Sequence, residues 1–389
     1  MSVVDRRKRD KGNHRRPYQV LYRDGSGARR SKQFRLRKDA EAWAHRTGVD
    51  VSEGVHTPES ETVTVREAGD RWLASVKAAG LERSTYEQYE QHLRLHLIPL
   101  LGAVKLSALN VPRIRTFSDA LREDGRSPAM VRKVLSSLST LLKDAQEQGL
   151  TTRNPVRDMK RQRHTPSDRD RLQVGRDIPA PPEIKQIVDA AQGRWRPMLI
   201  TAIFTGVRSS ELRAIRWTDI DLAGAIIHIR QRVDRFGQFG PPKSKAGNRS
   251  IPLPPIVVNT LREWRLACPK GPLGLAFPNA SGGMERHTYM IEKGLLPTLV
   301  AAGLAAVVLD GKGKPKIRGR YTGLHSLRHF YASWCINRRA DGGLELPAKS
   351  IQVRLGHSTI GMLMDTYGHL FPQSDDREAL AAGERALLG

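Results

Sequence analysis

From residue 161 to residue 178 the chain carries many charged side chains, and no apolar residue recurs there at helical or strand spacing. A segment without a hydrophobic face has nothing to bury against a core, so this pattern predicts an extended basic linker. The chain therefore cannot fold around one core. Its 389 residues agree with this, because a chain of that length ordinarily forms two or three domains.

The first part of the chain, residues 1–60, is its most basic stretch and contains short elements. Strand-like runs cover 18–22 and 31–36, a turn is expected at 24–27, and a helical run covers 38–47. These patterns predict a small sheet backed by a helix, with residues 1–16 disordered in the absence of a binding partner. The alternative is a solvated charge run or a disordered arm.

Residues 62–160 have the pattern of an all-helical domain. Thr64 with Glu67, and Ser84 with Glu87, have the spacing of capping boxes that begin helices. Apolar residues recur at helical spacing through 131–145, and Gly149 follows as a helix stop. We expect a bundle of about four or five helices.

Residues 179–373 mix helices with a short antiparallel sheet, and residues 374–389 form a C-terminal tail rich in Ala and Leu. Strands are expected at 225–230 and 249–253, and an insertion-like hairpin with a basic tip at 303–323. Helices are expected at 182–191, 195–204, 209–216, 255–267, 286–301, 325–338, 347–354 and 358–367. The fold class is thus multidomain and mainly α with small antiparallel sheets (α+β).

The charge balance indicates what the protein binds. The chain has 65 Lys+Arg against 40 Asp+Glu, a formal net charge of +25, which suits a polyanionic partner. A membrane surface is the competing partner, but no run approaches the roughly 18–20 apolar residues of a spanning helix. The only cysteines, Cys268 and Cys335, give neither a disulfide framework nor a four-ligand zinc site. We expect a reducing, cytoplasmic compartment and nucleic acid as the partner.

Five side chains in the last half of the chain could break and rejoin a phosphodiester without a metal cofactor. They are Arg208, His325, Arg328, His357 and Tyr367. Charge that grows on the phosphate oxygens must be neutralised either by metal ions held by carboxylates or by protein cations. Because no Asp/Glu cluster in the sequence has metal-ligand spacing, the sequence favours the cations.

The two arginines are the expected phosphate clamps. Arg208 follows Gly206 at a junction between helices, where a guanidinium can bind two non-bridging oxygens with parallel hydrogen bonds. Glu211, one helical turn further on, is expected to orient Arg208, and Arg328 supplies the second clamp. The alternative for Arg208 alone is an ordinary salt bridge on a surface helix.

The histidines can move or share protons. His325 lies three residues before Arg328, on the same helical face, and can donate to a phosphate oxygen or accept the proton of the attacking hydroxyl. A zinc site at His325 and His329 is the rival interpretation, but Ser326 stands where the zinc-protease pattern requires glutamate. His329 is interpreted as a packing residue or one that supports the site indirectly. His357 is expected to donate a hydrogen bond to the phosphate.

Tyr367 is the predicted nucleophile. Its hydroxyl has an ordinary pKa of about 10, and we expect the surrounding cations to lower that pKa. The alternative is a core tyrosine in an amphipathic helix. The leaving oxygen also needs a proton, which a lysine on the segment before strand 249–253 can deliver. Lys245 is our first choice for this general acid and Lys243 the alternative.

This ordered set resembles the catalytic signature of the tyrosine recombinases, the phage integrase family. The likeness covers about 190 residues with specific motifs, and it is weaker for residues 62–160, which resemble the core-binding domain. Residues 1–60 resemble the arm-type DNA-binding domain of lambda-type integrases. On that interpretation the DNA-contacting residues of the first segment are Arg15, Arg16, Arg29, Arg30 and Lys32.

The resemblance implies a site-specific recombinase that integrates, and also excises, a phage or other mobile element in a bacterial cell. It implies a 3′-phosphotyrosyl intermediate, no cofactor, a homotetramer on double-stranded DNA attachment sites and strand exchange through a Holliday junction. A host DNA-bending protein and a directionality factor are the further partners it suggests, and the tail 374–389 could dock on a neighbouring subunit.

Two rival functions stay open from the sequence. A type IB topoisomerase also uses a tyrosine nucleophile within an arginine cage, but it relaxes DNA without exchanging partners. A DNA-binding regulator could keep the fold and lose the chemistry, although every catalytic position is filled here.

Overall fold

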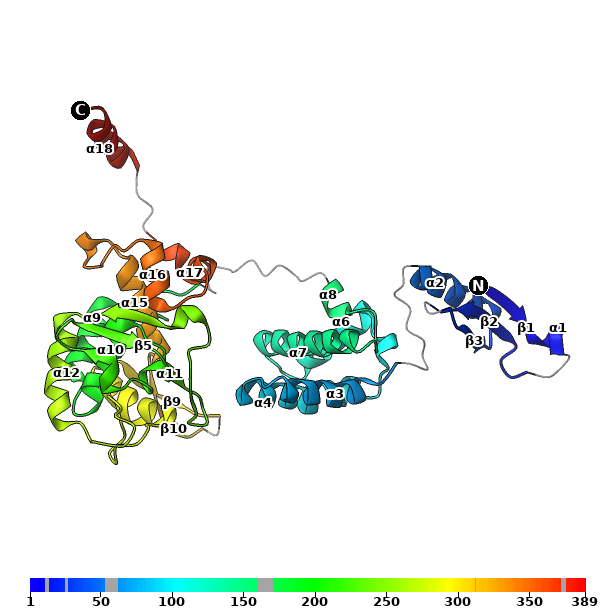
Figure 1. Cartoon of the computed structure of the whole chain (residues 1–389), viewed down its shortest axis with the longest axis horizontal. Coiled ribbons are helices and arrows are strands. Elements are labelled where there is room, and N and C mark those ends of the chain that lie inside the picture. Colours follow the sequence, from blue (N-terminus) through cyan, green and yellow to red (C-terminus); the bar gives the residue numbers. More distant parts are fainter. Residues whose placement is uncertain (11–13, 25–26, 53–61, 160–170, 312, 372–375) are drawn as a thin grey trace. The chain divides into compact units, whose positions relative to one another are not determined.

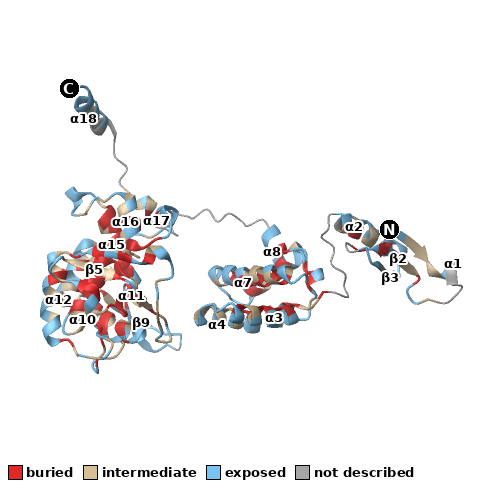
Figure 2. Cartoon of the chain, in the orientation of Figure 1, coloured by how far each residue is buried: buried red, intermediate tan, exposed pale blue. Residues whose placement is uncertain are grey.

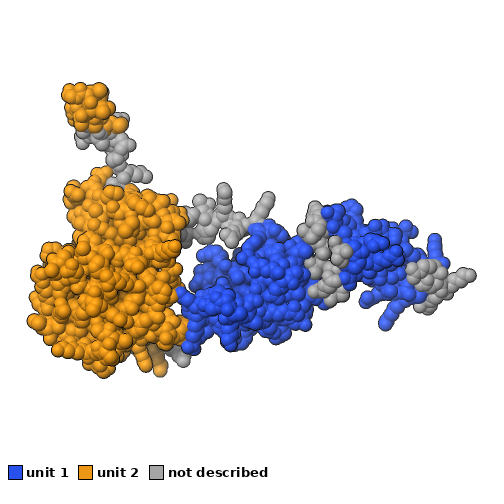
Figure 3. Space-filling view, viewed as in Figure 1, with its two compact units in different colours: residues 1–163 blue, residues 164–389 orange. Residues whose placement is uncertain are grey.

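The computed structural model describes residues 1–10, 14–24, 27–52, 62–159, 171–311, 313–371 and 376–389 (Figure 1). Contacts divide the chain into two compact units, Met1–Arg163 and His164–Gly389 (Figure 3). Most elements are helices, and the sheets are small and antiparallel, as the sequence predicted. Most of the expected linker, residues 161–170, lies outside the described residues. The expectation is wrong for its last part, 171–178, because Ile178 is buried in the core of unit 2 and Leu172 packs against that core.

The first elements of unit 1 form a three-stranded sheet with a helix. The strands β1 (Ser2–Asp5), β2 (Tyr18–Arg23) and β3 (Arg29–Phe34) lie in the order β1-β2-β3, and α1 (Arg6–Asp10) and α2 (Arg37–Ser52) accompany them. Val20 and Tyr22 are buried, and the Tyr22 ring packs edge-on against Trp43 of α2 at 5.3 Å between centroids. The predicted strands and helix are confirmed, while the turn at 24–27 falls partly outside the described residues.

The expectation of disorder in residues 1–16 is wrong for residues 1–10. The strand β1 pairs antiparallel with β2, with Val3 opposite Val20. The adjacent residues Val3 and Val4 have high strand propensity, and the many charges that follow them hid this signal.

The rest of unit 1 is a helical bundle around a separate apolar core. Its helices are α3 (Val65–Ala78), α4 (Arg83–His92), α5 (Ile98–Leu101), α6 (Val111–Glu123), α7 (Pro128–Glu147) and α8 (Pro155–Asp158), with a π turn, η1 (Leu93–Leu97), between α4 and α5. Thr64 and Glu67 form the predicted capping box at the start of α3. The box at Ser84 is wrong: α4 begins at Arg83 with Glu82 at its N-cap, two residues before Ser84, and the Glu87 carboxylate accepts from Arg83 at 2.9 Å.

Unit 2 surrounds a larger core with helices (Figure 2). The helices are α9 (Pro181–Ala190), α10 (Trp195–Thr205), α11 (Ser209–Leu212), α12 (Pro255–Ala267), α13 (His287–Tyr289), α14 (Leu296–Ala301), α15 (His325–Ile336), α16 (Ala348–Leu355), α17 (Ile360–Tyr367) and α18 (Asp376–Leu388). The helix α10 is almost entirely buried and packs against α12 and α15. The predicted helix 209–216 ends early, at Leu212.

Small sheets border these helices. The strands β4 (Ile220–Asp221), β5 (Ile226–Ile229) and β8 (Arg249–Pro252) form one sheet, and β6 (Arg232–Val233) pairs with β7 (Phe239–Gly240). The insertion at 303–323 is the predicted hairpin, made of β9 (Ala305–Leu309) and β10 (Pro315–Gly319). The predicted pairing of the strands near 225–230 and 249–253 is likewise confirmed as β5 with β8.

Candidate active site

The junction between α10 and α11 sets the position of Arg208. Gly206 ends α10 in the left-handed conformation, at φ +60°, and a Cβ on this residue would come within 2.4 Å of the Tyr331 ring. Only glycine satisfies both conditions, because other residues are strained at positive φ and would clash with α15. Two residues later Arg208 occupies the N-cap of α11, with its side chain about one third exposed at 36%.

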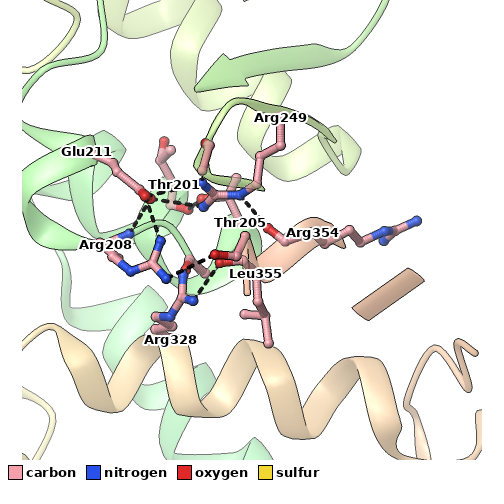
Figure 4. Close-up of polar contacts among 11 residues, drawn as sticks. Thr201, Thr205, Arg208, Glu211, Arg249, Arg328, Arg354 and Leu355 are labelled. Atoms are coloured by element: carbon pink, nitrogen blue, oxygen red, sulfur yellow. Dashed lines mark hydrogen bonds and ion pairs between the residues drawn. The ribbon is translucent and has the colours of Figure 1, made fainter. Parts of the chain in front are cut away.

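Glu211 links Arg208 to a second arginine that sequence reasoning missed (Figure 4). Its carboxylate accepts from the Arg208 backbone at 2.9 Å and from the Arg208 guanidinium at 2.8 Å. The Arg249 guanidinium donates to both oxygens of the same carboxylate, at 2.9 and 3.2 Å. Burial raises the pKa of Glu211, but hydrogen bonds and charge from Arg249 and Arg208 outweigh it and leave that pKa below its ordinary value. Glu211 is therefore a buried anion between two cations.

Arg249 could have been recognised from the strand pattern. Along β8 and the residue after it, the alternating residues Arg249, Ile251 and Leu253 are buried, while Ser250 and Pro252 are exposed. A charged residue on the inward face of a strand predicts a buried partner. Arg249 also donates to the Arg354 carbonyl at 2.7 Å, so it ties β8 to the C-terminal end of α16.

Arg328 lies at the centre of the site and is only 2% exposed. Its guanidinium donates to the Gly206 carbonyl at 2.7 Å and to the Leu355 carbonyl at 2.6 Å, so it joins the C-terminal ends of α10 and α16 (Figure 4). Burial, followed by the charge of Arg208, lowers the pKa of Arg328 to about 9. An anion entering here would relieve that repulsion.

The loop after α16 brings His357 to the arginines. Gly356 caps α16 in the left-handed conformation, at φ +64°, and its carbonyl accepts from Arg208 at 3.2 Å. His357 is 8% exposed, and its Nδ1 atom is buried without a hydrogen-bond partner. Burial, and then the charges of Arg328 and Arg208, lower the pKa of His357 to about 4. A neutral imidazole with an unused polar atom is suited to a ligand that brings its own acceptor or donor.

Tyr367 ends α17, is 2% exposed and packs beside His357. Its ring stacks parallel to that of His357 at 6.4 Å between centroids, and its hydroxyl lies 2.7 Å from Nδ1 of His329. Burial raises the pKa of Tyr367 to about 12, although Arg328 and Arg208 act in the opposite direction. The expectation that cations lower this pKa is therefore wrong for the protein without DNA, because desolvation of the phenolate outweighs them.

His325 and the two lysines are the exposed members of the predicted set. His325 is exposed, and its ring meets the ring of His329 edge-on at 4.5 Å. Lys243 and Lys245 are both exposed and lie on the segment between β7 and β8. That segment touches the His357 loop, since a Cβ on Gly356 would lie 3.0 Å from the Ala246 carbonyl. The structure brings the backbone of this segment to the site and leaves the choice between the two lysines open.

The basic residues expected to contact DNA in residues 1–60 divide into two groups. Arg15, Arg16 and Arg29 are exposed. Arg30 pairs with the buried Asp24 at 2.8 Å, and the Lys32 ammonium lies 5.2 Å from the Trp43 ring centroid, on the face of the sheet that packs on α2. Arg30 and Lys32 thus also make contacts inside the module.

Taken together, unit 2 has a buried tyrosine within reach of the charges of Arg328 and Arg208 and beside neutral histidines, an arrangement able to stabilise a pentacoordinate phosphate. Among the described residues no group of histidine, cysteine and carboxylate side chains could hold a metal ion. Within the same residues, none of the helices has the length and apolar character needed to cross a membrane.

Comparison with known proteins gives consistent matches. A family model described as the phage integrase family matches residues 180–374, half of the chain, and one described as phage integrase, N-terminal SAM-like domain, matches residues 64–122. The tyrosine recombinase XerC-like protein of Caldanaerobacter subterraneus is 24% identical over 374 residues, covering 91% of this chain and 92% of that protein. The prophage integrase IntR of Escherichia coli is 23% identical over 350 residues, covering 81% and 78%.

Solved structures show the same fold. The Tn1549 transposon integrase in complex with circular intermediate DNA matches with a TM-score of 0.61 at 18% identity, over 83% of this chain and 100% of that one. A lambda integrase tetramer bound to a Holliday junction matches with a TM-score of 0.53 at 19% identity, over 88% and 93%.

Proposed function

Because the chain belongs to the phage integrase family, we propose that this site-specific recombinase breaks and rejoins DNA through a 3′-phosphotyrosyl bond to Tyr367. The observation that carries the proposal is the buried Tyr367, whose ring stacks on that of His357 and whose hydroxyl lies within reach of the charges of Arg328 and Arg208. Four segments that are far apart in the sequence converge there. A core tyrosine needs no such surroundings.

The roles of the cations follow from their contacts. Arg328 and Arg208 already donate to protein carbonyls and to Glu211, and we assign their remaining N–H groups to the non-bridging phosphate oxygens. Carbonyl and carboxylate contacts hold both guanidiniums before substrate arrives, so the transition state requires little reorganisation. His357 binds the phosphate through its unused nitrogen, and the exposed His325 binds it as well.

The leaving 5′ oxygen takes its proton from Lys245, or from Lys243 as the alternative. Both side chains are exposed on a segment next to the His357 loop. The broken bond is replaced by a phosphotyrosine of similar energy, so rejoining requires no ATP and no metal cofactor.

We assign the parts of the chain as follows. Residues 1–60 contact arm-type DNA sites through basic residues, residues 62–160 bind core sites, 161–170 link the two units, and 179–373 carry the chemistry. The basic residues are Arg15, Arg16, Arg29, Arg30 and Lys32. The segment 374–389 contains α18, whose Leu380, Leu387 and Leu388 are exposed, and it docks on a neighbouring copy.

The assembly we propose is a homotetramer on double-stranded attachment sites in the bacterial cytoplasm, by analogy with the lambda integrase tetramer bound to a Holliday junction. A host DNA-bending protein and a directionality factor are further proposed partners. The chain would integrate and excise a phage or a related mobile element, as the relatives' names suggest.

Covalent trapping tests the chemistry. A pool of nicked duplexes with randomised cores is incubated with the full chain, denatured, and assayed for protein-linked DNA, which is then sequenced. The wild-type chain should form an adduct that the Tyr367→Phe variant does not form. A wild-type chain that binds duplex without any adduct would show a DNA-binding protein instead. Relaxation of supercoiled plasmids that lack the recovered sequence would favour a topoisomerase.

A further inference from the structure

A group that accepts the Tyr367 proton must lie within hydrogen-bond distance of the Tyr367 hydroxyl. His325 is the histidine that the sequence favoured as proton acceptor, but the atom within hydrogen-bond distance of the hydroxyl is Nδ1 of His329, at 2.7 Å. His325 and His329 lie four residues apart on α15, and their rings meet edge-on. The inner histidine, rather than the exposed one, therefore touches the reacting oxygen.

The direction of this hydrogen bond follows from the protonation states. Burial, then the charges of His325 and Arg328, lower the pKa of His329 to about 4, so its imidazole is neutral near pH 7. Burial keeps Tyr367 protonated, with its pKa raised to about 12. The phenol therefore donates to Nδ1, and the imidazole proton of His329 resides on Nε2.

We propose that His329 is a catalytic residue that accepts the Tyr367 proton during attack and returns it during rejoining. This proposal rests on the proposed function. As a lone pair of the phenolic oxygen forms the bond to phosphorus, the hydroxyl proton moves to Nδ1, and His329 becomes an imidazolium. The bond from phosphorus to the 5′ oxygen breaks, and the 5′ oxygen keeps the electron pair of that bond. It then receives a proton from the lysine. The reverse sequence restores the phenol and the neutral imidazole.

The surroundings of His329 explain why the proton moves only with the reaction. The gap between the two pKa values forbids transfer at rest, which keeps the phenol uncharged and protected until substrate binds. An entering phosphodiester adds negative charge that favours the imidazolium. Asp177 acts in the same direction, and its carboxylate is held by the Gln173 backbone at 3.0 Å and by the Arg176 side chain at 2.8 Å. Formation of the bond to phosphorus lowers the basicity of the phenolic oxygen at the same moment.

Two substitutions separate proton transfer from simple positioning. In His329→Asn the side-chain oxygen occupies about the place of Nδ1, so it still accepts from the Tyr367 hydroxyl, but it cannot hold a proton near pH 7. In His329→Ala both properties are lost. Both variants, the wild type and Tyr367→Phe are assayed on the duplex recovered by the trapping experiment, with DNA binding measured in parallel by mobility shift.

We expect His329→Asn and His329→Ala to bind DNA like the wild type and to cleave it about 100-fold more slowly or worse, as for loss of a general base. Cleavage by His329→Asn within a few-fold of the wild type would leave only a positioning role and overturn the proposal. A wild type that forms no adduct would refute the proposed function, and this inference with it.

A second substrate distinguishes the two proton transfers. When sulfur replaces the bridging 5′ oxygen, the leaving group needs no proton, so this duplex should restore cleavage by Lys245→Ala but not by His329→Asn. Restoration of His329→Asn would place its defect at the leaving group and contradict the proposal.

Nitrogen NMR of the DNA-free chain tests the contact even if a variant misfolds. The wild-type His329 should show an unprotonated Nδ1 whose resonance changes in Tyr367→Phe. A protonated Nδ1 at neutral pH would exclude the acceptor role.

Discussion

The buried carboxylate of Glu211 allows the sharpest test of how the site is held together. Glu211→Gln preserves shape and one acceptor oxygen but removes the negative charge that the Arg249 guanidinium faces at 2.9 Å. The Glu211 side chain is 3% exposed and the Arg249 side chain 1%, so water cannot replace the lost charge. Removing one partner of such a pair costs about 3–5 kcal/mol. We expect unit 2 to lose free energy of unfolding in that range.

Urea unfolding of the full chain at pH 7, followed by tryptophan fluorescence and hydrogen exchange, measures the loss. The two units have separate apolar cores, so hydrogen exchange assigns each transition to its unit. Asp189→Asn is the matched control: it breaks an exposed ion pair with Lys185 on α9 and should leave stability unchanged. A change in Glu211→Gln no larger than in this control would refute the reasoning.

The pH dependence of the same variant gives an independent check. The arginines hold the pKa of Glu211 below 4.5 against the effect of burial. The ionised carboxylate therefore adds to the free energy of unfolding above pH 4.5, and this stabilisation is lost as the pH falls through the lowered pKa. The difference between wild type and Glu211→Gln should therefore shrink in acid. A difference that stays constant would mean that lost packing, rather than lost charge, explains the effect.

Three further outcomes follow from the structure. Gly206→Ala should destabilise unit 2 by about 2 kcal/mol or more in calorimetry, because it combines positive φ with a clash against Tyr331; a neutral effect would contradict the tight turn. Burial lowers the pKa values of His329 and His357 from 6.5 to about 4, so their contribution to stability is complete above pH 6.5 and is lost as the pH falls towards 4, by up to about 3 kcal/mol each. The midpoint of thermal unfolding should change less between pH 6.5 and pH 4 when both histidines are replaced by asparagine. In unit 1, Ser137→Ala should cost about 1–3 kcal/mol in urea unfolding, because it leaves the buried Nδ1 of His92 without its partner at 2.8 Å; an unchanged unfolding midpoint would mean that another group satisfies that atom.

Much of the local structure could be predicted from the sequence because it depends on neighbours along the chain. The capping box at Thr64, the apolar stripe of α7 and the pairing of β5 with β8 all follow from spacing, and the structure confirms them. The Ser84 box failed for a local reason as well, since Glu87 had a closer partner in Arg83. The ordered motifs around Arg208 and Tyr367 were likewise sufficient to indicate the family.

Only the tertiary structure decided which groups come together at the site and which charge each one carries. Arg249 meets Glu211 across 38 residues, and His329 meets Tyr367 across the same separation, distances over which no helical or strand period carries information. The pKa of Tyr367 depends on a balance between desolvation and nearby cations that composition cannot supply. The order of the residues along the chain is enough to predict a nucleophile, but the ionisation of Tyr367 and the hydrogen-bond partner of its hydroxyl depend on how the fold packs around it and excludes water.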